Sequence, residues 1–297
     1  MIFMKKPIFT GSGVALVTPF SEDGVNFQKL GELIEFHITH KTDALIICGT
    51  TGEKSTLSVP EHKDVLKFCA EKVNGRIPII AGTGGNDTNA SVALSQYAEL
   101  IGYDGLLLVT PYYNKATQKG LCEHYGRIAK STRLPLILYN VPSRTGVSIS
   151  LDTLKYLDEN YENINAIKEA SGDVAFAARI KAHTDLCIYS GNDDVTVPIM
   201  ALGGQGVISV VANILPEETH NMCEFALHGN FDEANRLYMS MLDVMDAMFL
   251  EVNPIPVKTA MNLMGFEVGG LRLPLCDMED KNADKLKRIL ADYGLIK

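Results

Sequence analysis

Short apolar runs recur along the first two thirds of the chain, and each run is followed by a turn rich in Gly, Thr, Ser or Asn. The runs are continuous rather than alternating between apolar and polar residues, which is typical of parallel strands that are covered on both faces. The pattern predicts eight strands, at residues 14–17, 44–48, 77–81, 105–109, 134–139, 164–168, 186–189 and 206–210.

Amphipathic segments with helix start signals separate these runs. A capping box, formed by Ser58 and Glu61, opens one of them. Strand and helix in repeated alternation predict an α/β fold, a (β/α)8 TIM barrel. A doubly wound sheet would carry a Gly-x-Gly-x-x-Gly turn, but the turn after the third run has Asp87 in place of the last glycine. The helices between the runs are predicted at residues 26–40, 58–73, 88–101, 118–131 and 173–183.

The pattern changes after Val211, where helix signals continue without a convincing strand. The first of these later helices can close the barrel as its eighth helix, and the others predict a C-terminal helical extension. We therefore expect a barrel catalytic domain at residues 1–229 and a helical domain at residues 230–297. The later helices are predicted at residues 216–228, 231–250, 255–264 and 279–293.

Composition narrows the class of protein. The 297 residues are 46% hydrophobic and carry a formal net charge of −9, without a run of Lys or Arg, which argues against a nucleic-acid partner. Residues 1–7 lack the apolar segment of a signal peptide, and no apolar stretch approaches the roughly 20 residues that cross a bilayer. The cysteines are scattered without zinc-site spacing. The simplest interpretation is a soluble cytoplasmic protein without a membrane partner.

Active sites of such barrels lie at the carboxyl ends of the strands, and Lys168 ends the sixth run. Burial there would favour the neutral, nucleophilic form of a lysine, which can form a Schiff base with a keto acid. The alternative is an ordinary lysine at a strand end, whose stem packs on apolar neighbours while its ammonium group stays in water.

Two other turns can bind carboxylates. Gly49-Thr50-Thr51-Gly52 offers two hydroxyls and accessible backbone N–H groups, although its threonines could equally cap the following chain. Arg144, in a Pro-Ser-Arg-Thr-Gly turn, suits a second carboxylate because its guanidinium group can bind both oxygens. A surface position is the more frequent explanation of a single arginine.

Proton transfer and metal chemistry are constrained by the remaining polar residues. Tyr139 and Tyr113 could move protons during imine formation, although buried tyrosines at strand ends are common. All histidines fall in predicted helices, so we expect no histidine-bound catalytic metal. We also expect no cofactor. No close pair of acidic residues suggests glycoside hydrolysis, and Glu53 can simply fix its own loop.

Taken together, these turns resemble those of the dihydrodipicolinate synthase family, also called 4-hydroxy-tetrahydrodipicolinate synthase, over essentially the whole chain. The resemblance implies a condensation of pyruvate with aspartate semialdehyde in lysine and diaminopimelate biosynthesis, with Lys168 as the Schiff-base residue. The motifs that carry it are Gly49-Thr50-Thr51-Gly52-Glu53, Thr110-Pro111-Tyr112-Tyr113-Asn114, Tyr139-Asn140-Val141-Pro142-Ser143-Arg144-Thr145-Gly146 and Ile167-Lys168-Glu169-Ala170.

The resemblance also implies roles for other residues. The residue matching Tyr113 reaches into a neighbouring subunit's site in the family, which implies a homodimer or homotetramer. Enzymes of the family that lysine inhibits bind it at the subunit interface, where Lys54 of this chain should disfavour a cationic amino acid. The implied roles are a proton relay of Tyr139, Thr50 and Tyr113, pyruvate binding by Thr51, aldehyde binding by Arg144, and pocket-lining positions at Gly191 and Ile208.

The sequence leaves two alternatives open. Another pyruvate-dependent aldolase, such as N-acetylneuraminate lyase or a keto-deoxy-sugar acid aldolase, would share Lys168 and the glycine-containing turn. Arg144 and the Tyr112-Tyr113 pair favour the synthase, because a short aldehyde with its own carboxylate requires a cation. A purely regulatory or binding barrel is the alternative from a different class, and it predicts no covalent adduct with pyruvate.

Overall fold

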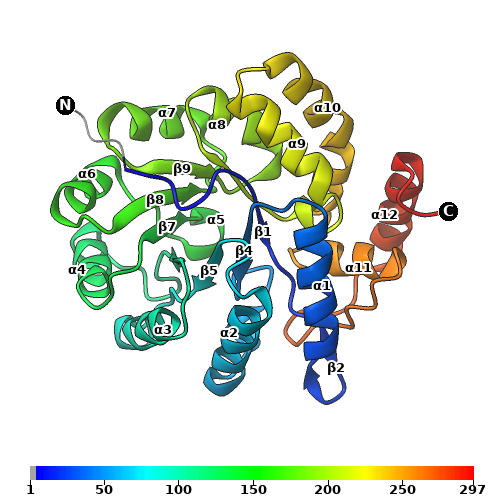
Figure 1. The fold of residues 1–297 in the computed structure, drawn as a ribbon, viewed down its shortest axis with the longest axis horizontal. Helices are drawn as coiled ribbons and strands as arrows, with labels where there is room; N and C mark the ends of the chain where they lie inside the picture. The colour runs from blue at the N-terminus through cyan, green and yellow to red at the C-terminus, as the bar shows by residue number, and fades with distance from the viewer. Residues whose placement is uncertain (1–4) are drawn as a thin grey trace.

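The computed structural model describes residues 5–297, so part of the amino-terminal segment in which we predict no signal peptide lies outside the described residues. Parallel strands form a closed barrel, which closes because β1 pairs with both β4 and β10 (Figure 1). The predicted TIM barrel is confirmed, and every predicted run overlaps a barrel strand. The strands are β1 (Gly11–Ala15), β4 (Ala44–Ile47), β5 (Ile79–Gly82), β6 (Gly105–Val109), β7 (Leu136–Asn140), β8 (Ile164–Glu169), β9 (Cys187–Ser190) and β10 (Gly206–Ser209).

Helices surround the barrel (Figure 1). The predicted capping box is confirmed, because Glu61 N donates to Ser58 Oγ and Ser58 N donates to Glu61 Oε2. Among the described residues, three helices were not predicted from the sequence, namely α5 (Pro142–Thr145), α6 (Leu151–Asn160) and α8 (Thr196–Ala201). The predicted ones are α1 (Phe27–Thr39), α2 (Val59–Val73), α3 (Thr88–Leu100), α4 (Gln118–Ala129), α7 (Val174–His183) and α9 (Pro216–Leu227).

Several short elements connect these strands and helices. A two-stranded antiparallel hairpin precedes α1, and three single turns of 3-10 helix follow β4, β9 and β10. Because they lie at the carboxyl ends of the strands, these turns shape the open end of the barrel. The short elements are β2 (Phe20–Ser21), β3 (Gly24–Val25), η1 (Lys54–Thr56), η2 (Asp193–Val195) and η3 (Val211–Asn213).

The hydrophobic core has two parts, because successive strand residues point to opposite faces. In β8, Ala166 packs inside the barrel and Ile167 packs between the strands and the helices. The amino-terminal end of the barrel is closed by Phe9 and Tyr189, whose rings stack at 4.4 Å. Tyr189 Oη also donates a hydrogen bond of 2.6 Å to the carbonyl oxygen of Phe9. The opposite end of the barrel is therefore left for the site.

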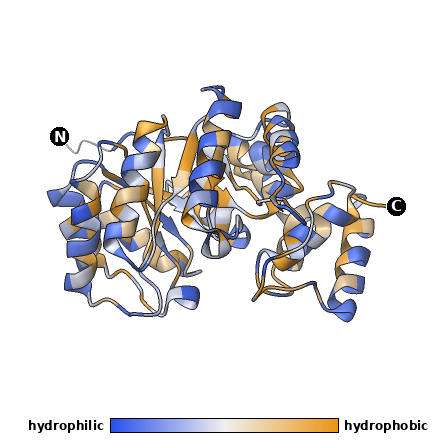
Figure 2. Ribbon diagram, turned by 90° about the horizontal axis from the view of Figure 1, so that it is seen from below, coloured by the Kyte–Doolittle hydropathy of each residue, from blue (hydrophilic) through white to orange (hydrophobic). Residues whose placement is uncertain are grey.

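The last part of the chain forms the predicted helical extension. Its helices are α10 (Phe231–Ala247), α11 (Ile255–Leu263) and α12 (Asp280–Tyr293), and residues 211–297 contain no strand. Helix α10 packs against α8, α9 and α12, and the last helices form one end of the elongated molecule (Figure 2). The division into domains at residues 229 and 230 remains a prediction. None of the helices within residues 5–297 has the length and apolar character that a bilayer span requires.

Candidate active site

A cavity of about 440 Å³ lies at the carboxyl ends of the barrel strands, where barrels of this type place their active sites. Residues that follow β4, β7, β8 and β9 line it, together with residues of the C-terminal extension. The structure thus brings together six predicted site residues that are far apart in the sequence, namely Thr50, Thr51, Tyr139, Arg144, Lys168 and Gly191.

Lys168 lies near the end of β8 and is only 5% exposed. Its register partner on β7 is Tyr139, and Nζ lies 4.4 Å from the centroid of the Tyr139 ring. Within residues 5–297, Nζ has no hydrogen-bond or ion-pair partner. Since no carboxylate holds this nitrogen, it can approach a carbonyl carbon in the cavity.

The turn after β4 places Thr50 and Thr51 on the cavity wall. Glu53 N donates to the carbonyl oxygen of Thr50 at 3.1 Å, which closes the turn. Gly52 approaches neighbouring backbone so closely that a Cβ atom there would lie 3.1 Å from the carbonyl oxygen of Leu16. The tight turn leaves the two hydroxyls beside the cavity, an arrangement that suits a small carboxylate.

Arg144 lies in α5, directly after β7, and its exposed side chain lines the cavity. One nitrogen, Nη2, donates to the carbonyl oxygen of Asn253 at 3.1 Å. A guanidinium group has five N–H donors in a planar fork, so this one bond orients Arg144 and leaves donors for a ligand carboxylate. Arg144 is therefore both exposed, as the sequence allowed, and part of the cavity wall.

Gly191 and Ile208 occupy different environments, although both were predicted to line the pocket. Gly191 is on the cavity wall, and a Cβ atom there would lie 2.5 Å from Cβ of Ala170. Its N–H group already donates to the carbonyl oxygen of Glu169 at 2.7 Å. Ile208 is fully buried inside the barrel and is not part of the cavity wall, to which Val210 contributes just after this strand.

Tyr113 is a predicted site residue that the structure leaves outside the cavity. Its side chain is 91% exposed, and it does not line the cavity. Its φ of 73° lies in the left-handed region, which is uncommon for a residue with a side chain. The structure of the single chain therefore does not bring Tyr113 to Lys168.

Asp193 fixes the loops after β9 and β10. Its buried carboxylate accepts hydrogen bonds from the backbone N–H groups of Val210 and Val211, at 3.0 and 3.1 Å. Burial raises the pKa of this carboxyl, and hydrogen bonds and the charge of Lys168 oppose that rise. Within residues 5–297, no group of three or more His, Cys, Asp or Glu side chains is arranged to hold a metal ion.

The C-terminal extension contributes residues to the site that were not predicted from the sequence. Asn253 is 5% exposed, and its Nδ2 donates to Thr51 Oγ1 at 3.0 Å, while its carbonyl oxygen binds Arg144. Asp246 and Phe249 of the same extension also line the cavity. The Asn-Pro-Ile-Pro sequence at residues 253–256 was the available signal, because two prolines at the start of a predicted helix mark a fixed connection.

A second, smaller cavity of about 210 Å³ adjoins the first and shares Thr50, Tyr139 and Arg144 with it. Lys54 lines this cavity, and its Nζ donates to the carbonyl oxygen of Gly84. Burial lowers the pKa of Lys54 to about 8. The open end of the barrel therefore has a second lysine, Lys54, in a cavity beside that of Lys168.

Comparison with known proteins agrees with this geometry. Residues 8–293 match the model of the family described as the dihydrodipicolinate synthetase family. The 4-hydroxy-tetrahydrodipicolinate synthase of Acetivibrio thermocellus is 57% identical over 293 residues, which cover 99% of this chain and 100% of the relative. The synthase of Clostridium tetani is 54% identical over 292 residues, with 98% and 99% covered.

Solved structures give the same result. The chloride-inhibited dihydrodipicolinate synthase of Acinetobacter baumannii, in complex with pyruvate, superposes with a TM-score of 0.94. It is 45% identical in sequence, and the match covers 97% of this chain and 99% of that one. With a matching family model over nearly all of its length and relatives above half identity, this chain belongs to the dihydrodipicolinate synthetase family.

Proposed function

We propose that the protein is a 4-hydroxy-tetrahydrodipicolinate synthase, which condenses pyruvate with L-aspartate 4-semialdehyde through a Schiff base on Lys168. The observation that carries the proposal is the position of Lys168, buried at the carboxyl end of β8, without an ionic partner, and facing a cavity. Close relatives that bear this name, and a related structure in complex with pyruvate, support the choice of substrates.

The reaction begins when the Lys168 amine attacks the keto carbon of pyruvate and water leaves, which forms an imine. Loss of a methyl proton converts the imine to an enamine, whose terminal carbon attacks the aldehyde carbon. The substrate's own amine then attacks the imine carbon, closes the ring and releases Lys168. The balance is one molecule of each substrate consumed, with one product and one water formed.

The cavity wall supports the division of roles. Thr50 and Tyr139 carry hydroxyls near the lysine and transfer the protons that imine formation requires. Thr51 binds the pyruvate carboxylate. Arg144, whose guanidinium group has donors left after its bond to Asn253, binds the carboxylate of the aldehyde. Gly191 shapes the wall, and Ile208 supports it from inside the barrel.

Tyr113 supports the proposal of a homo-oligomer. A ring that is 91% exposed on a left-handed backbone gains little within its own chain, so it is available to a second copy, where it completes the proton relay. We expect Tyr113→Phe to lower kcat without changing the oligomeric state in analytical ultracentrifugation. A fully active monomer would contradict this role.

The deciding experiment is borohydride trapping with pyruvate, followed by mass spectrometry. The protein should gain one reduced pyruvyl group, and peptide mapping should place it on Lys168. Lys168→Ala should gain none, whereas Lys54→Met, which removes the lysine of the neighbouring cavity, should still be labelled. The absence of an adduct on the unaltered protein would exclude the mechanism. Turnover with aspartate semialdehyde but not N-acetylneuraminate then separates the synthase from the lyase.

A further inference from the structure

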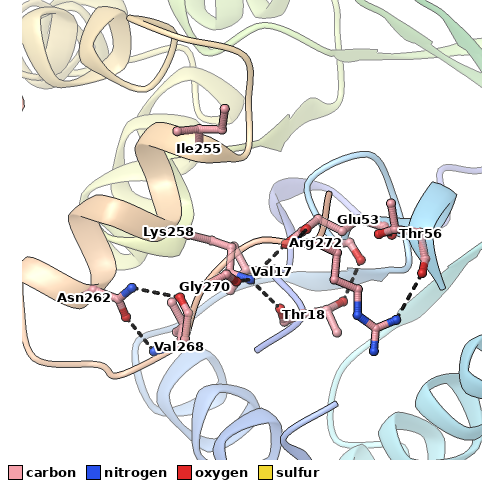
Figure 3. A network of polar contacts seen from close by, with 12 residues as sticks. Val17, Thr18, Glu53, Thr56, Ile255, Lys258, Asn262, Val268, Gly270 and Arg272 are labelled. Carbon is pink, nitrogen blue, oxygen red and sulfur yellow. Dashed lines mark hydrogen bonds and ion pairs between the residues drawn. The ribbon is translucent and has the colours of Figure 1, made fainter. Parts of the chain in front are cut away.

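A second buried lysine connects the C-terminal extension to the turn that carries Thr50 and Thr51. Lys258 of α11 is 1% exposed, and its Nζ donates to Glu53 Oε1 at 2.9 Å. The same nitrogen donates to the carbonyl oxygens of Thr18, at 3.1 Å, and Gly270. Figure 3 shows this nitrogen at the centre of the polar network between α11 and the turns after β1 and β4. Three acceptors from three separate segments therefore meet at one ammonium group.

Glu53 transmits this contact directly to the turn. Its backbone N–H closes the turn on Thr50, and its φ of 52° lies in the left-handed region. Cys48, at the other end of the same turn, also has a left-handed φ, of 56°. Non-glycine residues adopt this conformation at a cost in free energy, so they persist only where the surrounding structure holds them.

Thr18 and Arg272 make further hydrogen bonds to this turn. Thr18, whose carbonyl oxygen binds Lys258, donates from Oγ1 to the carbonyl oxygen of Gly52 at 2.7 Å. The second carboxylate oxygen of Glu53 is bound by the backbone N–H of Arg272 at 3.0 Å (Figure 3). Lys258 thus acts, through one intermediate residue each, on Thr50 and on Gly52, which flank Thr51.

An ion pair buried this deeply is not explained by stability alone. Well-packed apolar residues of similar volume often serve as well as a buried pair, because two charges must be removed from water. Burial lowers the pKa of Lys258, and Glu53 opposes this shift. What the pair provides, and apolar residues cannot, is a fixed direction for each hydrogen bond.

We propose that Lys258 is a positioning residue, which holds Thr50 and Thr51 through Glu53 and Thr18 in the geometry that binds the pyruvate carboxylate. This role rests on the proposed function and goes beyond it, because it makes the C-terminal extension part of the pyruvate site. Loss of Lys258 should therefore weaken pyruvate binding in protein that remains folded.

The test measures the pyruvate concentration that gives half-maximal borohydride labelling of Lys168. We expect Lys258→Met to raise this concentration about 10-fold or more, since small displacements of a binding group have large effects. Glu53→Gln retains an acceptor for Lys258 and should raise it less, by about 3-fold. The KM for aspartate semialdehyde should rise less than the half-maximal pyruvate concentration does, because Arg144 reaches this network only through Asn253 and Thr51.

Lys5→Met is the matched control for loss of stability. Lys5 forms an ion pair of 2.6 Å with Asp158, with side chains 15% and 10% exposed, and it also donates to the carbonyl oxygen of Ile164. Ile164 begins β8, so this pair lies at the end of the barrel opposite the cavity. Lys5→Met should lower the melting temperature while half-maximal labelling stays within about 2-fold of the unaltered protein.

The double variant Glu53→Gln/Lys258→Met separates positioning from stability. It leaves no uncompensated buried carboxylate, so its melting temperature should exceed that of Lys258→Met. Its half-maximal pyruvate concentration should stay raised, since the bonds from Lys258 are still missing. If Lys258→Met does not fold, Glu53→Gln and the double variant decide.

Two results would overturn the inference. One is half-maximal labelling within about 2-fold of the unaltered protein in every folded variant. The other is a double variant whose pyruvate binding recovers together with its melting temperature. If the unaltered protein itself forms no adduct, the proposed function fails; if it forms the adduct and the variants match it, only the role of Lys258 fails.

Discussion

The surroundings of Lys168 and Lys258 differ in one respect that decides what each lysine does. Both side chains are buried, at 5% and 1% exposed, and each nitrogen lies 4.4 Å from the centroid of an aromatic ring. Lys258 Nζ has a carboxylate and two carbonyl oxygens as partners, whereas Lys168 Nζ has none within residues 5–297. Full pairing makes a buried lysine structural, and an unpaired nitrogen at a cavity is available for covalent chemistry.

The largest effect is expected at the unpaired lysine. Lys168→Met should lower kcat/KM by at least about 10³-fold, because it removes the nucleophile. The free energy of unfolding should stay within about 1 kcal/mol of the unaltered protein, since no ion pair is lost. A steady-state assay and urea denaturation measure the two quantities. A large loss of stability would mean that Lys168 has a structural role like that of Lys258.

The paired lysine should give the opposite result for stability. Lys258→Met leaves Glu53 buried without its cation, so we expect the free energy of unfolding to fall by about 3 kcal/mol. Urea denaturation of this variant beside Lys168→Met tests the comparison directly. Equal losses of stability in the two variants would show that pairing does not distinguish the two lysines.

Three buried histidines can be compared with the two buried lysines, because burial favours the neutral form of each imidazole. Burial lowers the pKa of His37 and of His62 to about 3, and that of His124 to about 4. Each has a buried Nε2 without a hydrogen-bond partner in the described chain. Unlike Lys168, none of them lines the cavity of about 440 Å³.

These shifts predict acid sensitivity. The folded pKa lies below the unfolded value of about 6.5, so the unfolded chain binds more protons as the pH falls below that value. Stability is therefore fully present above about pH 6.5 and is lost towards the folded pKa, by about 1.4 kcal/mol per pH unit for each histidine. Urea denaturation at pH 7 and pH 5 measures how steeply the free energy of unfolding falls as the pH is lowered. His37→Gln should reduce this dependence by the contribution of one histidine. An unchanged slope in that variant would contradict the role of His37.

The smallest expected effect is that of Lys54, in the neighbouring cavity, on inhibition by L-lysine. Because its pKa is about 8, Lys54 remains mostly protonated at pH 7 and should repel the cationic side chain of lysine. We therefore expect an inhibition constant for L-lysine above about 1 mM. Lys54→Ser should strengthen inhibition, and the assay needs only initial rates. A constant well below about 1 mM in the unaltered protein would contradict this prediction.

Much of the fold followed from local pattern, with instructive exceptions. The apolar runs located every barrel strand, because a strand covered on both faces must be apolar throughout. Helix α6 does show a helical spacing of apolar residues, at Leu151, Leu154 and Leu157. Helix α8 has six residues and includes Pro198, so it is too short to show a helical period.

Part of the site could be predicted from the sequence, because the carboxyl ends of parallel strands meet at one end of a barrel. That rule grouped Lys168, Tyr139 and Thr50 from the sequence alone, and all three line one cavity. It could not place Asn253, because contacts between a distant extension and a barrel loop leave no periodic trace in sequence. Nor could it show how Tyr113 reaches an active site. Tyr113 is 91% exposed in the single chain, and in the proposed oligomer it enters the site of a second copy of the chain.

The sequence by itself determined the barrel and the residue types at its strand ends, because hydrophobic period and turn chemistry are local properties. Only the tertiary structure decided which of Lys168 and Lys258 is paired, because burial and partners depend on segments that are distant in the sequence. The prediction that Glu53 can simply fix its own loop was incomplete for the same reason. Glu53 holds its turn with a cation supplied by α11, 205 positions further along the chain.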